Sequence, residues 1–129
     1  MSIEASIRTM LTTGTTLSLV PDARVTHGYR LQDSALPAVT FEVTDDSQAG
    51  VVVGSRQVEV EVRSIAVEGV DALAIAAQVR AAAVAGTYSG IQFKAVLFRG
   101  TRLEAGEQGE GDESVPAEAV TQLTIFYRE

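Results

Sequence analysis

The 129-residue chain contains no cysteine and no tryptophan, and it has one histidine and one lysine. The absence of cysteine excludes disulfide frameworks, thiol catalysis and thiolate zinc sites. No apolar run approaches the roughly 18 residues that a membrane-spanning helix needs. The N-terminus has no basic segment followed by an apolar run, so we expect no signal peptide and a protein made in the cytoplasm.

Basic residues are also scarce, with ten against seventeen acidic ones and a net charge of −7. Tight binding of nucleic acid depends on lysine and arginine side chains that neutralise phosphates, and the arginines here are scattered along the chain. We therefore expect no specific nucleic-acid binding. Six acidic residues and no basic one lie between positions 104 and 118, so most of the net charge belongs to this segment.

The apolar residues, 46% of the chain, suffice for one folded domain over 1–129. A helix is predicted at the N-terminus, where Ser2 is a suitable cap and apolar residues follow a helical spacing: Ile3, Ile7, Met10 and Leu11. A second helix is predicted over 72–85, which is rich in alanine and is followed by Gly86. The residues that share one face of it are Val70, Leu73, Ala77, Arg80, Ala81 and Val84.

Alternating apolar and polar residues predict five strands, over 24–31, 38–44, 57–65, 91–99 and 119–127. The strands 38–44 and 57–65 are expected to form an antiparallel hairpin with its tip near 45–56. The element order is α-β-β-β-α-β-β, without β-α-β repetition. We therefore predict an α+β domain with a single, mainly antiparallel sheet and two helices packed on one face. Arg63 on the hairpin and Arg80 on the second helix are placed to pair with Glu59 or Glu61.

The predicted hairpin tip carries three consecutive valines, Val51, Val52 and Val53, with Arg56 close by. Branched apolar side chains gathered at a tip are unfavourable in water. Either the strands extend further and one valine points inward, or the tip docks on another subunit. The second interpretation makes these four residues a candidate interface with a neighbouring subunit or a tube.

The chain offers little catalytic chemistry. His27 is the only imidazole, and its place in an alternating strand indicates a structural side chain rather than a general base. Neither a GxSxG elbow nor an HExxH motif occurs. We expect no catalytic residue, no bound cofactor and no enzymatic activity. A small enzyme that uses His27 or the acidic segment is the least favoured alternative.

The acidic segment is predicted to be a flexible loop over 104–118. Its glycines do not form a phosphate-binding loop, because the Gly-Lys-Ser/Thr ending is missing and the side chains are negative. Carboxylates are suitable calcium ligands, but the EF-hand spacing is absent, so we expect no metal site. We interpret the loop as an acidic surface on the outside or in a lumen, made by Glu104, Glu107, Glu110, Asp112 and Glu113.

The order and spacing of several stretches resemble the tail terminators of long-tailed bacteriophages and related particles. After the N-terminal helix, they are RVT (24–26), LPAVTF (36–41), RQVEVEV (56–62), AAQVRA (76–81) and LTIFYRE (123–129). The similarity covers nearly the full length. The chain departs from the family pattern in its glycine-rich acidic loop and at Arg63 and Ser64, where a more aromatic strand end is usual.

This resemblance implies a structural virion protein rather than an enzyme. Tail terminators form a hexameric ring on the completed tail tube, stop its polymerisation and join it to a head-side connector or stopper protein. DNA passes through the lumen. The implied location is the head-proximal end of the tail, in a virion assembled in the host cytoplasm, without membrane contact. Another neck or head-completion protein is the alternative.

Overall fold

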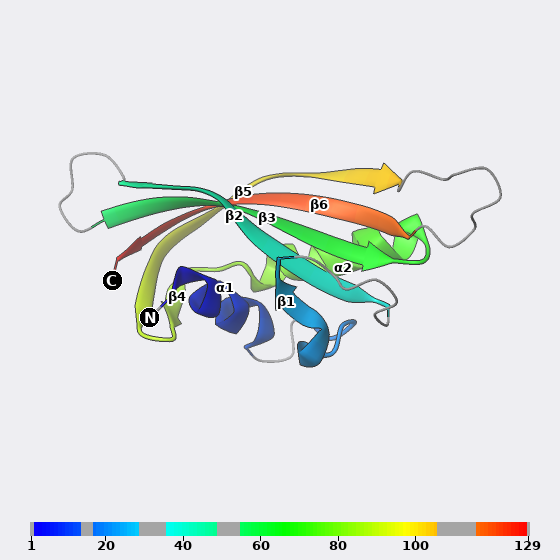
Figure 1. The fold of residues 1–129 in the computed structure, drawn as a ribbon, viewed down its shortest axis with the longest axis horizontal. Helices are drawn as coiled ribbons and strands as arrows, with labels where there is room; N and C mark the ends of the chain where they lie inside the picture. Colours follow the sequence, from blue (N-terminus) through cyan, green and yellow to red (C-terminus); the bar gives the residue numbers. More distant parts are fainter. Residues whose placement is uncertain (1, 14–16, 29–35, 49–54, 106–115, 129) are drawn as a thin grey trace.

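A computed structural model describes residues 2–13, 17–28, 36–48, 55–105 and 116–128, and Figure 1 shows its fold. The elements in chain order are α1 (Ile3–Thr12), η1 (Asp22–Arg24), β1 (Val25–His27), β2 (Ala38–Gln48), β3 (Ser55–Ala66), α2 (Gly69–Ala82), β4 (Gly86–Tyr88), β5 (Ile91–Ala105) and β6 (Ala117–Arg128). The long strands β2, β3, β5 and β6 run the length of the molecule, and α1 lies between β4 and β1 (Figure 1).

The described strands form one six-stranded sheet in the order β1-β2-β3-β6-β5-β4. The α+β class is confirmed, but the predicted element order and pairing need correction. The chain contains an additional strand, β4, and β1 pairs with β2 in parallel, so the sheet is mixed. The strand β4 has only three residues, too few for an alternation to be recognised. Alternation also carries no information on strand direction, so it did not reveal the parallel pair.

The hairpin of β2 and β3 is longer than predicted. Residues 45–48 and 55–56, which the sequence pattern places in its tip, lie in the two strands, and the antiparallel pairing of β2 with β3 continues to Gln48 and Arg56. The β5–β6 hairpin is likewise extended, because Glu104 and Glu118 are paired residues rather than loop residues. The strand residues next to the turns of both hairpins are mostly polar, charged or small. Hydrophobic alternation alone therefore predicts strands that stop short of the turn.

The N-terminal helix agrees with the sequence. The Ser2 hydroxyl accepts a hydrogen bond from the Ala5 amide at 3.2 Å and caps α1. Ile7, Met10 and Leu11 are buried, as their spacing predicts. The apolar stripe therefore both forms the helix and attaches it to the sheet.

Helix α2 begins and ends three residues earlier than predicted, and its buried face differs from the one singled out by the sequence. The buried residues are Ala72, Ile75, Ala76, Val79 and Ala82, whereas Val70, Leu73 and Val84 are exposed. Because apolar residues surround this alanine-rich helix on all sides, the sequence does not single out the face that packs inward.

Buried side chains of both helices belong to one hydrophobic cluster with alternating residues of the sheet. The sheet residues in this cluster include Val39, Phe41, Val58, Val60, Val62, Leu123, Ile125 and Tyr127. The residues between them in sequence point to the opposite face of the sheet. In the described part of the chain, no helix is long and apolar enough to span a membrane.

Candidate assembly surface

The sheet face opposite the hydrophobic cluster carries charged and polar side chains, and we call it the polar face. The strand registers place its residues side by side across four strands. Its members include Glu42 and Asp45 of β2, Gln57, Glu59, Glu61 and Arg63 of β3, Glu118, Gln122 and Thr124 of β6, and Leu97, Arg102 and Glu104 of β5.

One ion-pair network on the polar face joins β3, β5 and β6. The Arg63 guanidinium lies 2.5 Å from Glu61, 3.2 Å from Glu104 and 3.2 Å from Glu118. Arg102 lies 2.8 Å from Glu104 and 3.6 Å from Glu61. The network holds three neighbouring strands together and confirms the predicted pairing of Arg63 with Glu61. The same prediction for Arg80 was wrong, because its guanidinium lies over the Phe98 ring instead.

The network shifts the pKa values of two of its members. Burial lowers the pKa of Arg63, but the nearby Glu61, Glu104 and Glu118 carboxylates outweigh this effect, and the net shift is upward. A hydrogen bond from Arg102, and a second one from Arg63, lower the pKa of Glu104 against the opposing effect of burial. The charged forms of these groups therefore stabilise one another.

A second polar chain crosses the same strands. The Thr124 hydroxyl is fully buried, donates to a Glu59 carboxylate oxygen at 2.7 Å and accepts from Arg99 Nε at 2.9 Å. Gln57 donates to the other Glu59 oxygen at 3.0 Å. Arg99, an extra residue at a register shift in β5, is thus held on the polar face. These hydrogen bonds connect side chains of β3, β6 and β5, and each carboxylate oxygen of Glu59 accepts one of them.

The sheet has two partly unpaired edges among the described residues. β1 pairs only with Val39–Phe41 of β2, so residues 42–48 have no outer neighbour there; we call them the β2 free edge. β4 pairs only with Ile91–Phe93 of β5, so residues 95–105 form the corresponding β5 free edge. Unpaired strand edges present backbone donors and acceptors to other chains.

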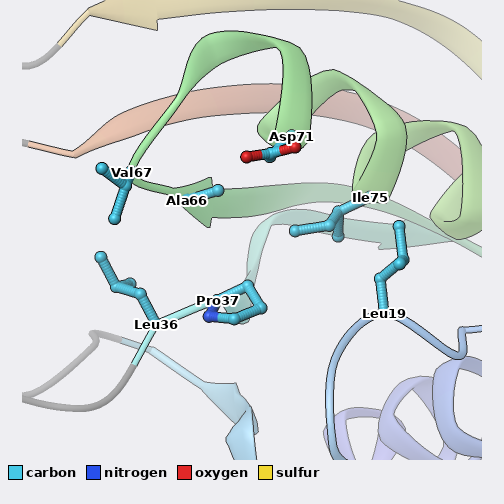
Figure 2. A pocket seen from close by; sticks show the side chains of 7 residues that line it. All are labelled: Leu19, Leu36, Pro37, Ala66, Val67, Asp71 and Ile75. Atoms are coloured by element: carbon cyan, nitrogen blue, oxygen red, sulfur yellow. The ribbon is translucent and has the colours of Figure 1, made fainter.

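A small pocket lies where Leu36 and Pro37 approach the start of α2. Figure 2 shows Leu36 and Val67 pointing toward each other, with Ile75 and Leu19 on the other side. The pocket has a volume of about 220 Å³, below the ~300–1,000 Å³ typical of small-molecule sites. It has the size for a single side chain, and the residues that line it are Leu19, Leu36, Pro37, Ala66, Val67, Asp71 and Ile75.

The sequence-predicted interface falls mostly outside the described residues. This applies to Val51, Val52 and Val53, whose role at an interface stays a prediction. Arg56 lies in β3, and its Nε donates to the Tyr127 hydroxyl at 3.1 Å. It therefore has a partner within its own sheet.

Of the predicted acidic surface, Glu104 is described and belongs to the ion-pair network of the polar face. Glu107, Glu110, Asp112 and Glu113 lie outside the described residues, so the orientation of the acidic loop stays a prediction. Within the described ranges, no group of three or more His, Cys, Asp or Glu side chains could hold a metal ion.

His27 lies at the end of β1, with its ring 5.4 Å from the Phe41 ring. This packing agrees with a strand side chain. Sequence reasoning missed Arg99 and Arg102 as surface residues, because the predicted strand ends at Arg99 and gives no register beyond it. The apolar residue Leu103 is a signal that the strand continues beyond Arg99. A strand of that length would have placed both arginines beside β6, with β3 as the next strand.

No protein-family model and no curated protein matches this sequence. Among solved structures, a chain in the virion of a native gene transfer agent (GTA) particle is similar, with a TM-score of 0.73 and 16% sequence identity. The match covers 99% of this chain and 96% of that chain. The two chains share a fold. Because neither chain has a large unmatched segment, the shared fold accounts for the entire domain.

Proposed function

We propose that this chain is a structural virion protein, a tail terminator that forms a hexameric ring on the end of a tail tube. The observation that carries the proposal is the full-length likeness to a chain of a gene transfer agent virion. The sequence resemblance to tail terminators supports it independently. In this role the ring stops tube polymerisation and joins the tube to a head-side connector or stopper protein, at the head-proximal end of the tail.

The two free edges suit a ring. A ring needs contacts in which one patch meets a different patch of the next copy. The β2 and β5 free edges are different surfaces on opposite sides of one sheet, so both can be occupied in every copy. Hydrogen bonds and ion pairs hold the side chains of the polar face in place, which suits a structural role. We propose no catalytic role for it.

The charge of the chain suits a conduit for DNA. Each cationic side chain that contacts a phosphate adds salt-dependent affinity, which would slow passage. On the polar face Arg63 and Arg102 are paired with carboxylates, and Arg99 donates a hydrogen bond to the Thr124 hydroxyl. We propose that this face, or the acidic segment that follows Glu104 and ends before the start of β6, lines the lumen and lets DNA slide without binding it specifically.

The proposal is tested with purified protein in the presence and absence of matching tail tubes, by mass photometry and native mass spectrometry. We expect a closed hexamer, at the latest when tubes are present. A protein that stays monomeric even on tubes contradicts the proposal. A virion reconstruction then locates the chain: density on the tube end supports a terminator, whereas density on the capsid side identifies another neck or head-completion protein.

A further inference from the structure

We propose that neighbouring copies join by antiparallel pairing of the β2 free edge of one copy with the β5 free edge of the next, so that the sheet continues from subunit to subunit. The inference rests on the proposed ring for its stoichiometry. The pairing itself follows from strand direction, edge position and charge.

Strand direction allows the pairing. β2 is antiparallel to β3, β3 to β6, and β6 to β5, so β2 and β5 run in opposite directions. When a second copy extends the sheet in the same orientation, its β2 lies antiparallel to β5 of the first copy. Two-stranded antiparallel contacts of this kind satisfy the backbone groups that each edge leaves open.

The positions of the free edges require a displacement along the strands. β1 covers the beginning of β2, and β4 covers the beginning of β5, so the two free edges lie toward opposite ends of the sheet. A copy placed level with its neighbour would bring β1 against the neighbour's β5. Displacement removes this overlap, and closed sheets need such a stagger between strands.

The alternation of side chains restricts the displacement to even numbers of residues, because an odd shift turns the polar face over. A shift of about four residues clears most of β1 and keeps the polar faces continuous. Thr44 is an extra residue at a register shift in β2, so Val43 and Asp45 occupy adjacent positions along the strand pairing. Followed through the strand registers, the shift places Asp45 of one copy opposite Arg102 of the next, and Val43 opposite Leu103. Residues 100–105 of β5, which this register uses, lie beyond both register shifts of that strand.

Charge complements this arrangement. Glu42 and Asp45 are exposed on the β2 side, and they lie directly across from Glu61 and Glu59. Like charges at such cross-strand positions repel. Neither Glu42 nor Asp45 forms an ion pair or side-chain hydrogen bond in the described part of the chain. The β2 free edge therefore lacks cations on the polar face.

The β5 free edge supplies them. Arg99 binds the Thr124 hydroxyl, and no carboxylate lies within ion-pair distance of it among the described residues. Arg102 retains 48% exposure of its side chain despite its contacts with Glu61 and Glu104. Both arginines point to the same face as Glu42 and Asp45. Pairing the edges brings the two sets together.

Apolar exposure points to the same strand. Leu97, Phe98 and Leu103 are 41%, 36% and 50% exposed, and all three belong to the β5 free edge. The guanidinium of Arg80 covers one side of the Phe98 ring at 4.1 Å. Phe98 and Leu103 lie on the same face of the sheet as the hydrophobic cluster. In the proposed pairing, Val43 of the next copy covers Leu103. Burying this surface favours association.

Because the chain has no cysteine, engineered thiols report the contact directly. The test variant combines Val43→Cys with Leu103→Cys, and the control combines Val43→Cys with Val70→Cys, an exposed position on α2 that is 74% accessible. Within one copy, residues 43 and 103 lie three strand spacings apart, about 14 Å, which is too far for a disulfide. Any disulfide therefore joins two copies.

The purified full-length variants are oxidised with copper phenanthroline, with and without tail tubes, and analysed by non-reducing electrophoresis. We expect a ladder of disulfide-linked species up to the ring for the test variant and little linkage for the control. A second measurement uses charge: Asp45→Arg or Arg102→Asp alone should weaken association about tenfold. The double substitution should restore it, with the melting temperature of the monomer measured for each variant.

The outcomes separate this inference from the proposed function. A hexamer in native mass spectrometry without linkage of the test variant, and without restoration by the double substitution, overturns the edge pairing and leaves the ring intact. Linked copies that never close into a ring or bind tubes support the edge pairing and contradict the terminator role. Equal linkage in test and control variants indicates random collision and overturns the edge pairing.

Discussion

At the residue scale, most buried polar groups of this protein have a partner, and Ser64 is the exception among the described residues. Its side chain is fully buried, and its hydroxyl has no hydrogen-bond partner. It points into the hydrophobic cluster, between Val39 and Ala119 on the neighbouring strands. Thr124, equally buried, has two partners. The two residues therefore have opposite consequences for stability, although both are small hydroxyl residues in central strands.

We predict that Ser64→Ala raises the free energy of unfolding by about 1 kcal/mol, because an unsatisfied buried hydroxyl costs roughly 1–3 kcal/mol. Thr124→Val is the matched comparison and should lower it by about 1–3 kcal/mol, since it leaves Glu59 and Arg99 without their shared partner. Urea denaturation of both variants checks this. Destabilisation by Ser64→Ala would mean that the hydroxyl has a partner in the folded protein.

Glu104 provides a pH-dependent prediction. The pKa of its carboxyl is lowered in the folded protein, chiefly by the hydrogen bond from Arg102. Its contribution to stability is therefore fully present above the ordinary pKa of 4.5 and is lost as the pH falls through the lowered folded value. Glu104→Gln should be less stable than the wild type at pH 7 and equal to it in strong acid. Because Glu104 is 40% exposed, solvent screening keeps the difference small.

The comparison is made by thermal unfolding of both proteins between pH 7 and pH 3. A stability gap that stays constant over this range would show that the substitution acts through packing rather than through the carboxylate charge.

At the element scale, the two helices differ in how well their sequences specify them. Helix α1 has a cap, a first-turn acid and one apolar stripe, so its boundaries and its buried face could both be predicted. Helix α2 has an extended N-cap residue, Glu68, whose side chain makes no capping hydrogen bond. Its alanines give it high helix propensity without a distinct apolar face. Its orientation is decided by the sheet that it packs on.

The strands also differ in how well the sequence predicts them. Alternation predicted β3 and β6, because their residues face a core on one side and polar groups on the other. It did not predict that Arg102 of β5 reaches Glu61 across β6, since that contact depends on a register of three strands. The polar face was therefore only partly predictable: an ion pair of Arg63 was predicted and Glu104 was expected on an acidic surface, but the positions of Arg99 and Arg102 were not predicted.

The missing cap of α2 leads to a prediction. Glu68→Asp should raise the free energy of unfolding by about 0.5–1 kcal/mol, because aspartate at an N-cap accepts hydrogen bonds from the first turn and glutamate seldom does. Ser2→Ala should lower it by about 1 kcal/mol, because the Ser2 hydroxyl already caps α1. Differential scanning calorimetry measures both. No gain from Glu68→Asp would indicate that the first-turn amides of α2 are already satisfied.

At the scale of the whole molecule, charge and fold are largely separate. The sheet and helices bury the core, whereas most of the net charge of −7 lies in residues 104–118. Of these, Glu104 and Glu118 are register partners at the ends of β5 and β6, and they share Arg63. The remaining acidic residues, Glu107, Glu110, Asp112 and Glu113, are added to a hairpin that is already closed by its strands.

We predict that deleting residues 107–113 leaves the fold intact. Ala105 and Ala117 are register partners, and the four residues left between them match the length of ordinary hairpin loops. A shorter loop also closes with a smaller loss of entropy, so the free energy of unfolding should change by no more than about 1 kcal/mol.

The matched control replaces the four acidic residues of this segment by glutamine and keeps the loop length. Circular dichroism and urea denaturation should give the same fold for all three proteins, and loss of cooperative unfolding in the deletion alone would mean that the loop contributes contacts to the core. If both variants fold but only the full-length acidic loop supports DNA passage through assembled particles, the charge acts in the lumen. Full DNA passage through particles of the glutamine variant would contradict a role of the loop charge in the proposed lumen.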